Sequence, residues 1–439
     1  MEQGRIESGM AMWVRKRIDI GWSDLARGAV ACLRKHDDSR SRRTIGRCWS
    51  GGGRAPFVAL SVRSGLDLLL STEGFEPGDE IAMSALTIPD MPRIVREHGL
   101  VPVPIDVDPL TLSISEEAML AALSPRTKGV VVAHLFGGRM PLGSIAEICR
   151  ARGLLLIEDC AQAFAGFPEP GTDEGDISMY SFGPIKTHSS LIGAVFTCRD
   201  PDLADRLNAA QEAWPQVSGT EYLQRLIKYG FVKGLSLGPV AGTVAASLRL
   251  VGRDHDRMAT QMARGFAGGD FFSKIRRRPA SAILAMMSRR FAQFHDASVQ
   301  RRRALGERFR ARIGERIPVL GSEALDPTYW VLAISVDNPT ELVPKLWRHG
   351  FDATCSSSLQ AIPAPADRPH LDPVSGRQTL ATTVFLPLSH RMSDRTVDRL
   401  ADLVRHHAIP RSPSLPPRRG SLASNRAAEP LTLLSRTSG

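Results

Sequence analysis

The chain has 439 residues, of which 43% are hydrophobic, and this predicts a soluble globular protein of two or three domains. Its formal net charge of +10 is consistent with acidic lipid or phosphorylated small molecules as partners. An arginine-rich composition without any such partner explains the charge equally well. No zinc finger and no aromatic-rich RNA-binding strand is found, so no nucleic acid is expected. The six cysteines form no CxxC pair and lack metal-ligand spacing, which predicts reduced thiols, a cytoplasmic location and no metal.

The N-terminal half predicts a basic arm followed by a large α/β domain. Residues 1–50 are basic but contain apolar positions, so we expect an arm that packs partly on the body, and no signal peptide precedes it. Within residues 51–204, strand-like and helix-like segments alternate, which is typical of a mostly parallel sheet with helices on both faces. Strands are expected at 57–61, 80–84, 101–106, 129–134 and 154–159, and helices at 62–74, 90–98, 115–123 and 142–152.

The C-terminal half differs from the N-terminal half in composition and in its expected secondary structure. Residues 205–312 predict a helical, basic insertion whose longest uncharged run, 235–248, is too short and too broken by glycine and proline to span a membrane. Residues 313–408 predict a smaller α+β domain, with a strand at 329–335 and helices at 339–349 and 393–406. The tail, 409–439, is rich in proline, serine and arginine, and is expected to be disordered.

Three short segments contain residues that could bind a ligand or take part in catalysis. Residues 61–66 read Ser-Val-Arg-Ser-Gly-Leu at a strand-to-helix junction, where free backbone N–H groups can bind an anion, although many helices begin with serine as a simple cap. Residues 157–162 read Ile-Glu-Asp-Cys-Ala-Gln, so two acids end an apolar strand. Ligands bind at such strand ends, and a carboxylate there can keep a pyridine nitrogen protonated. The alternative is that Asp159 caps a helix.

The third segment, residues 178–188, reads Ser-Met-Tyr-Ser-Phe-Gly-Pro-Ile-Lys-Thr-His. Apolar surroundings lower the pKa of a lysine and make it a usable nucleophile, so Lys186 is a candidate catalytic residue. The alternative is a lysine that extends its ammonium group into solvent, which is the commoner situation for a single lysine.

Together these segments resemble the DegT/DnrJ/EryC1/StrS sugar aminotransferases, which are fold-type-I enzymes dependent on pyridoxal 5′-phosphate (PLP). The resemblance is clear over residues 55–200 and looser over 325–408. It includes the ordered matches Pro-Gly-Asp-Glu-Ile at 77–81, Ser-Pro-Arg-Thr-Lys at 124–128, His-Leu-Phe-Gly at 134–137, Glu-Asp-Cys-Ala-Gln at 158–162, Ser-Phe-Gly-Pro-Ile-Lys at 181–186 and Phe-Leu-Pro-Leu-Ser at 385–389.

The resemblance implies a role for each matching residue. Lys186 would form the Schiff base with PLP and later move a proton, while Asp159 would pair with the pyridine nitrogen. The remaining cofactor contacts implied are Gln162 to the ring oxygen, Ser181, Arg63 and Ser64 to the phosphate, and Ile88 against the ring. We also expect His134 and His188 to contact the substrate.

Some positions depart from the family pattern. The glycine expected before the phosphate-binding turn is Val62, and the position that often carries a stacking aromatic ring is Ile88. After Lys186 the chain reads Thr-His-Ser-Ser-Leu-Ile-Gly in place of the usual asparagine and glycine-rich stretch. These departures concern the substrate side of the site more than the cofactor side.

The expected function is therefore amination of a keto-sugar, linked to a nucleotide, with glutamate as the amino donor, by a homodimer. Two alternatives remain open: a decarboxylase or dehydratase reaction of PLP on the same core, and a non-catalytic scaffold at a membrane surface. The dehydratases of the family replace the lysine by histidine, which argues against that reaction.

The membrane alternative rests on residues 221–233, in which Leu223, Leu226, Ile227 and Phe231 recur at helical spacing with cations elsewhere on the helix. Arg276, Arg277 and Arg278 add a second basic cluster. Packing on the core is the alternative for this stripe.

Overall fold

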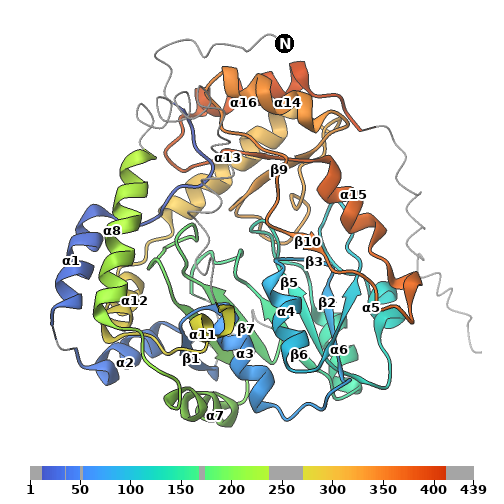
Figure 1. The fold of residues 1–439 in the computed structure, drawn as a ribbon. Helices are drawn as coiled ribbons and strands as arrows, with labels where there is room; N and C mark the ends of the chain where they lie inside the picture. The colour runs from blue at the N-terminus through green and yellow to red at the C-terminus, as the bar shows by residue number, and fades with distance from the viewer. Residues whose placement is uncertain (1–11, 35, 50–52, 168–173, 237–269, 412–439) are drawn as a thin grey trace, which may run out of the picture.

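A computed structural model describes residues 12–34, 36–49, 53–167, 174–236 and 270–411 (Figure 1). Almost all of the expected disordered tail, from 412 onward, lies outside the described residues, as does the apolar run beyond 236. In the described part of the chain, no helix is long and apolar enough to cross a bilayer. The six cysteines, all of which lie in the described residues, form no disulfide.

A seven-stranded sheet forms the centre of the molecule, with the strand order β1-β8-β7-β6-β5-β2-β4. The five strands from β7 to β4 are parallel, whereas β8 runs antiparallel to both β7 and β1. The predicted mostly parallel sheet is thus confirmed. Its strands are β1 (Ala55–Ala59), β2 (Glu80–Ser84), β4 (Val101–Ile105), β5 (Thr127–Ala133), β6 (Leu155–Asp159), β7 (Ile177–Ser181) and β8 (Ala194–Cys198).

Helices cover both faces of this sheet because successive strand residues point to opposite sides. Phe57 and Phe196 pack in one core with α3 (Val62–Thr72), α4 (Asp90–Glu97) and α7 (Pro201–Glu212). Their neighbours Val58 and Val195 face a second core, which is built with the N-terminal helices and with α8 (Gly219–Leu235) and α12 (Ser281–Ala292). A third core, around β2, β4 and β5, is closed by α5 (Glu116–Ala122) and α6 (Gly143–Ala151).

The N-terminal segment is more than an arm. Its described residues form α1 (Trp22–Cys32) and α2 (Asp38–Trp49), and Ile45 and Trp49 are completely buried. The indole of Trp49 lies 4.6 Å from the ring of Tyr180 on β7, measured between ring centroids. The helices α1 and α2 are therefore part of the wall of the large domain, next to α8 and α12 (Figure 1).

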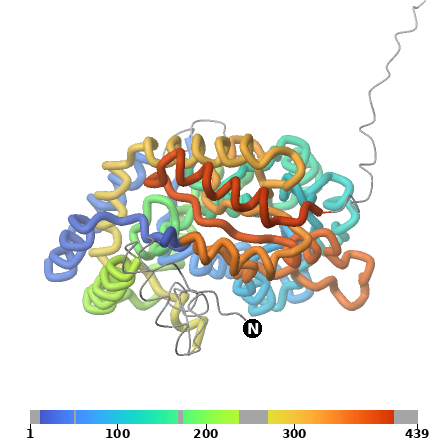
Figure 2. Tube along the Cα trace, turned by 90° about the horizontal axis from the view of Figure 1, so that it is seen from above, coloured from blue at the N-terminus to red at the C-terminus, as the bar shows by residue number. Residues whose placement is uncertain are grey.

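The expected helical insertion is shared between two regions. Its described residues contain helices and no strand: α8 (Gly219–Leu235), α11 (Phe271–Ile275) and α12 (Ser281–Ala292) lie beside the sheet, whereas α13 (Ala297–Ile313) packs on the C-terminal region. There α13, α14 (Pro339–Arg348) and α16 (Asp394–His407) surround the antiparallel pair β9 (Leu332–Ser335) and β11 (Thr383–Leu386). Seen from above, α16 lies between α13 and α14 (Figure 2).

Shorter elements connect this C-terminal region to the sheet. The strand β10 (Gln360–Ala361) pairs antiparallel with β3 (Leu86–Thr87), which directly follows β2. The turn η2 (Pro369–Leu371) and α15 (Val374–Thr382) lie alongside it. The backbone N–H groups of Ser375 and Gly376 donate to Asp106 at the end of β4, with N–O distances of 2.9 Å in both cases. These contacts fix the two regions around the carboxyl ends of the parallel strands.

Candidate active site

The carboxyl ends of β5, β6 and β7 bring the predicted polar residues together at one edge of the sheet. Ala133, Asp159 and Met179 are direct neighbours across the three strands. His134 follows β5 and donates its backbone N–H to the carbonyl oxygen of Asp159 at 3.0 Å. Ser181 is the last residue of β7 and is half-buried. This is the edge at which open parallel sheets bind their ligands.

Lys186 lies on the loop that joins β7 to β8. Backbone hydrogen bonds close this loop at its base, from Phe182 to Gly193 at 2.9 Å and from Ser190 to Phe182 at 3.0 Å. Inside the loop, Lys186 donates its backbone N–H to the carbonyl of Gly183 at 3.1 Å. The antiparallel pair thus presents Lys186 toward the strand ends on a tightly bonded turn.

The amine of Lys186 is enclosed by protein. Its Nζ atom lies 4.2 Å from the centroid of the Trp330 ring. Burial lowers the pKa of Lys186 to about 8; the carboxylate of Asp159 opposes this shift and the charge of Arg63 adds to it. Lys186 is therefore not an exposed surface lysine, and near neutral pH it carries a usable fraction of nucleophilic amine.

Asp159 faces the same space. Burial raises the pKa of Asp159, while the backbone N–H of Ala161, at 3.0 Å from its Oδ1 atom, and the charge of Lys186 act in the opposite direction. No helix begins in residues 160–167, so Asp159 caps a turn and not a helix. The charge of Asp159 raises the pKa of Lys186, and the charge of Lys186 lowers the pKa of Asp159.

The start of α3 supplies the third group. Ser61 is the N-cap, and its Oγ accepts from the backbone N–H of Ser64 at 3.1 Å, which confirms the predicted strand-to-helix junction. The Nε of Arg63 lies 2.5 Å from a carboxylate oxygen of Asp90, and the charge of Arg63 reaches Lys186 and Asp159. Ser64 is completely buried, and its hydroxyl lies 2.9 Å from that of Ser61. A phosphate contact by Ser64 thus stays a prediction.

Two of the predicted cofactor residues shape the site. The Oε1 of Gln162 accepts the backbone N–H of Phe136 at 3.0 Å, and Phe136 has a positive φ of 56°. Gln162 therefore stabilises a strained turn directly after β5. Ile88 is half-buried and packs against the cores on both sides of the sheet, as an aliphatic side chain that cannot stack like an aromatic ring.

His134 belongs to a buried ion-pair network. Its Nδ1 accepts the backbone N–H of Met140 at 3.1 Å, so Nε2 carries the proton and donates to Glu158 at 2.9 Å. Glu158 also accepts from Arg139 at 3.1 Å and from the backbone N–H of Gly175 at 2.6 Å. Both ring nitrogens of His134 are used inside the protein, so we assign it a positioning role in place of the expected substrate contact.

Glu158 should therefore contribute strongly to stability. Burial favours its neutral form, yet the hydrogen bond from His134, the charge of Arg139 and the N–H of Gly175 lower the pKa of Glu158 to about 2. Because the folded-state pKa is depressed, the stabilisation is present above the usual value of 4.5 and is lost as pH falls toward 2. We expect Glu158→Ala to lower the free energy of unfolding by about 3–5 kcal/mol, since it leaves buried charge unpaired.

Urea unfolding at pH 7 and pH 3 tests this expectation. The exposed Glu117 on α5 provides the control, and Glu117→Ala should change the free energy of unfolding by less than about 0.5 kcal/mol. The gap between wild type and Glu158→Ala should narrow at pH 3. A loss at pH 7 no larger than that of Glu117→Ala would contradict the assigned network.

His188 also has a structural role. Its backbone N–H donates to Asp19 at 2.6 Å, and its ring Nε2 lies 2.5 Å from the carbonyl oxygen of Arg290. The ring packs among aromatic side chains, with Phe294 at 5.0 Å between centroids. Burial and the charge of Arg290 lower the pKa of His188 to about 4, so it is neutral at pH 7. This geometry fastens the N-terminal segment to α12 and does not support the expected substrate contact.

Two residues at the site were not expected from the sequence. The indole Nε1 of Trp330 donates to the carbonyl of Ile185 at 3.2 Å. Arg302 on α13 donates from Nε to the carbonyl of Thr328 at 2.8 Å and from Nη2 to the hydroxyl of Thr187 at 3.3 Å. Burial lowers the pKa of Arg302 to about 10, while the charge of Asp19 opposes the shift. Both residues come from the C-terminal half and meet the Lys186 loop through tertiary structure alone.

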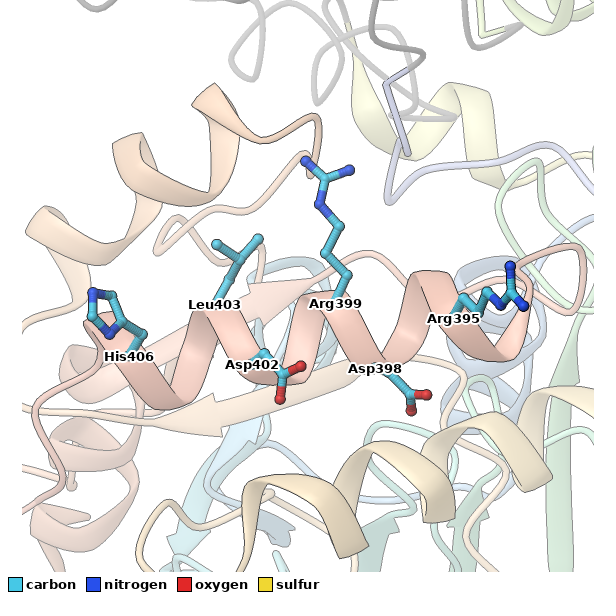
Figure 3. A pocket seen from close by; sticks show the side chains of 6 residues that line it. All are labelled: Arg395, Asp398, Arg399, Asp402, Leu403 and His406. Atoms are coloured by element: carbon cyan, nitrogen blue, oxygen red, sulfur yellow. The ribbon is translucent and has the colours of Figure 1, made fainter.

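A hollow of about 400 Å³ lies elsewhere, on the outer face of α16 (Figure 3). All of its lining residues come from that one helix, and its carboxylates Asp398 and Asp402 are paired with Arg308 and Arg312 of α13 at 2.6 and 2.7 Å. No predicted site residue lines it, so we do not assign a function to it.

Comparison with known proteins identifies the central region. Residues 58–231 match the sequence model of the DegT/DnrJ/EryC1/StrS aminotransferase family. The chain is 30% identical over 175 residues to the spore coat polysaccharide biosynthesis protein SpsC of Bacillus subtilis, covering 38% of this chain and 45% of that protein. It is 33% identical over 174 residues to a dTDP-4-dehydro-2,3,6-trideoxy-D-glucose 4-aminotransferase of Saccharopolyspora spinosa, covering 39% and 42%. The sequence matches thus span less than half the length of these relatives.

Likeness in structure extends further along the chain. The sugar aminotransferase CalS13 of Micromonospora echinospora superimposes with a TM-score of 0.64 over 90% of this chain and all of that one, at 18% sequence identity. At this identity the likeness establishes the fold, which is that of the fold-type-I PLP enzymes. The chain therefore has the fold of the sugar aminotransferases, and its residues 58–231 are similar to the DegT/DnrJ/EryC1/StrS aminotransferase family.

Proposed function

We propose that the protein is a PLP-dependent aminotransferase that moves an amine from glutamate to a keto-sugar linked to a nucleotide. The observation that carries this proposal is the enclosed amine of Lys186, whose charge is coupled to Asp159 and Arg63 within the family-matched region. The nucleotide-linked sugar is suggested by the Saccharopolyspora spinosa relative, which is a 4-aminotransferase of a dTDP-sugar.

The side chains at the site are chemically complementary to the functional groups of PLP. PLP carries an aldehyde, a pyridine nitrogen that can be protonated, and a phosphate. The site offers an amine with lowered pKa at Lys186, a half-buried carboxylate at Asp159, and a guanidinium at Arg63 beside the N-terminus of α3. Each of these protein groups is complementary to one group of the cofactor.

When bound, PLP supplies an electron sink for the negative charge that develops on the carbon next to the transferred amine. The chain supplies the remaining functions. The carboxylate of Asp159 would keep the pyridine nitrogen protonated. The Nζ of Lys186 acts as nucleophile, and afterwards accepts a proton from the reacting carbon and returns it at another position. Arg63 compensates the phosphate charge, and the network of His134 and Glu158 keeps the ends of β5 and β6 in register.

The spectrum of the purified full-length protein tests this function. With PLP it should show a visible absorption band, and glutamate in a panel of amino acids should bleach that band. A keto-sugar nucleotide should then restore it. Release of carbon dioxide, or loss of water from the sugar without a donor, would favour another PLP reaction. The absence of any band would favour the non-catalytic scaffold and overturn the proposal.

We further propose a homodimer in the cytoplasm, because enzymes that resemble this chain build each site from two subunits. Light scattering of the active protein should give twice the mass of one chain. Turnover per chain should fall as dilution produces monomers. Full activity at a concentration where only monomers are present would contradict the shared site.

A second proposal, peripheral attachment to anionic membranes, rests on an exposed apolar surface where α1 and α8 lie side by side (Figure 1). Ile227 and Phe231 on α8 are each 65% exposed, and Trp22 on α1 is 55% exposed. Gly230 on α8 lies close to Trp22, since a Cβ added there would be in ordinary van der Waals contact with the ring at 3.9 Å. The ammonium of Lys233 lies 5.7 Å from the centroid of that ring. An apolar surface rimmed by cations suits an acidic lipid headgroup region.

The structure changes which residues would take part. Leu226 is buried and Leu223 is half-buried, so these two residues follow the packing alternative. The lipid contact expected of the second basic cluster stays a prediction, and each of its arginines is paired with one or more carboxylates of the chain. The pairs are Arg276 with Asp67 and Glu97, Arg277 with Glu221, and Arg278 with Glu212.

Liposome flotation tests the attachment. The full-length protein should float with vesicles that contain phosphatidylglycerol, and should lose that binding as salt is raised. The double substitution Ile227→Ser and Phe231→Ser should abolish flotation. Leu120→Ser, at a residue 42% exposed on α5, is the matched control and should float like wild type. Equal recovery with neutral vesicles, or flotation of the double variant, would contradict this role.

A further inference from the structure

Trp330 is attached to the same short segment that carries the candidate catalytic lysine. Its ring centroid lies 4.2 Å from the Nζ of Lys186, and its indole N–H donates to the carbonyl of Ile185, the residue before that lysine. The hydrogen bond fixes the edge of the ring to the loop backbone. The face of the ring is thereby held against the amine.

The backbone behind Trp330 is braced by other contacts. The N–H and the hydroxyl of Thr328 both donate to the carbonyl of Gly137, at 2.9 and 3.0 Å, and the carbonyl of Thr328 accepts from Arg302. Gly137 has a φ of +96°, and a Cβ added there would lie 2.7 Å from the backbone nitrogen of Trp330. The close approach therefore requires glycine at 137, and it docks the Trp330 segment onto the turn after β5.

This arrangement has a chemical consequence for Lys186. An ammonium over the face of an indole ring is attracted by the negative π-face, most strongly where water is excluded. Burial and the nearby Arg63 act against the ammonium form of Lys186, whereas Trp330 and Asp159 favour it. Trp330 differs from Asp159 because it attracts the ammonium without adding a second charge to the site.

We propose that Trp330 is a positioning residue that holds the free amine of Lys186 in the site whenever that amine is not linked to the cofactor. The inference rests on the proposed function, in which the lysine is released when the amino donor takes its place. The released amine must stay within reach, accept a proton from the reacting carbon and hold that proton until it is returned. A flexible lysine chain without such a contact has many other rotamers available.

The test measures the pKa of Lys186 directly in the full-length protein after PLP has been removed. The rate of modification by trinitrobenzenesulfonate is followed against pH, and the modified lysines are resolved by peptide mass spectrometry. Trp330→Phe keeps an aromatic face and should leave the Lys186 pKa within a few tenths of wild type. Trp330→Leu keeps apolar bulk without a π-face, and should lower the Lys186 pKa by about one unit.

Lys128, whose side chain is 46% exposed, is the internal control and should titrate identically in all three proteins. A Lys186 pKa in Trp330→Leu that equals or exceeds that of wild type would overturn the proposal. So would an equal fall in the phenylalanine and leucine variants, because the hydrogen bond to Ile185 and not the ring face would then be responsible. Melting curves of the variants verify that the fold is retained.

Turnover separates this inference from the proposed function. In an active enzyme, Trp330→Leu should lower kcat more than it raises the KM for glutamate, because proton movement is affected more than binding. A protein that never binds PLP would defeat the proposed function and leave the titration result standing. An active enzyme whose Lys186 titrates alike in wild type and Trp330→Leu would defeat the inference alone.

Discussion

Lys186→Ala is expected to abolish amine transfer, with turnover lower than wild type by at least about 10³-fold. The substitution removes both the nucleophilic amine and the group that moves the proton. The fold should be retained, because the loop of Lys186 is closed by backbone hydrogen bonds that do not involve its side chain. Steady-state rates at saturating glutamate and keto-sugar nucleotide measure the effect.

Lys128→Ala is the control for this variant, since Lys128 lies at the far end of β5 and is partly exposed. Its turnover should match that of wild type. Turnover of Lys186→Ala within a few-fold of wild type would show that another residue supplies the amine.

Asp159→Asn is expected to lower turnover by about 100-fold or more. Asparagine has nearly the same volume, and its Oδ1 can still accept the backbone N–H of Ala161, so the turn after β6 is preserved. What is lost is the negative charge opposite Lys186 that would keep the pyridine nitrogen protonated. Rates, together with the visible spectrum of the bound cofactor, measure the effect.

Asp108→Asn is a matched control, because Asp108 is exposed and its Oδ1 accepts N–H groups of the turn at Leu110 and Thr111. That variant should remain fully active. Unchanged turnover in Asp159→Asn would mean that Asp159 organises the turn and has no further role.

Sequence patterns predicted the parallel part of the sheet well. The strand expected at 80–84 coincides with β2, and the helix expected at 90–98 ends one residue earlier, as α4. All of β2 is buried, and the apolar residues Met91, Ile94 and Val95 of α4 are buried among charged neighbours, so both segments carry a clear local pattern. The strands β7 and β8 were not expected, because they form a hairpin around the Lys186 loop and break the alternation of strands and helices. Every residue of β8 is buried, so it lacks the period of two that marks a half-exposed strand.

The N-terminal helices α1 and α2 were not predicted, because the segment that forms them is rich in charged residues. Arginines and serines dominate residues 38–47, which indicated a basic arm packed only partly on the body, yet Ser41, Ile45 and Trp49 follow one helical face and are buried. Three positions in a short window carry little periodic signal. Packing of Trp49 among aromatic rings from three other segments decides the outcome, and no local pattern contains that information.

Some residues of the site could be predicted from local sequence motifs, whereas others could be found only from tertiary contacts. Asp159 and Lys186 were recognisable because each sits in a short motif with its own chemistry. Glu158 was visible only as part of the motif, since its partners His134 and Arg139 lie on a different strand end. Trp330 comes from a segment 145 residues from Ile185, to which it bonds, so only tertiary structure could reveal the contact. Conversely, closeness to Lys186 in the chain suggested a substrate contact for His188, whereas its ring turns into an aromatic core.

Reduction of the PLP-loaded, full-length protein with borohydride, followed by peptide mapping, tests the central claim most directly. Borohydride converts a linkage between PLP and an amine into a stable bond, so the labelled residue can be read by mass spectrometry. The account predicts a single labelled peptide modified at Lys186. Label on a different lysine, or no label in protein that retains its cofactor, would contradict it.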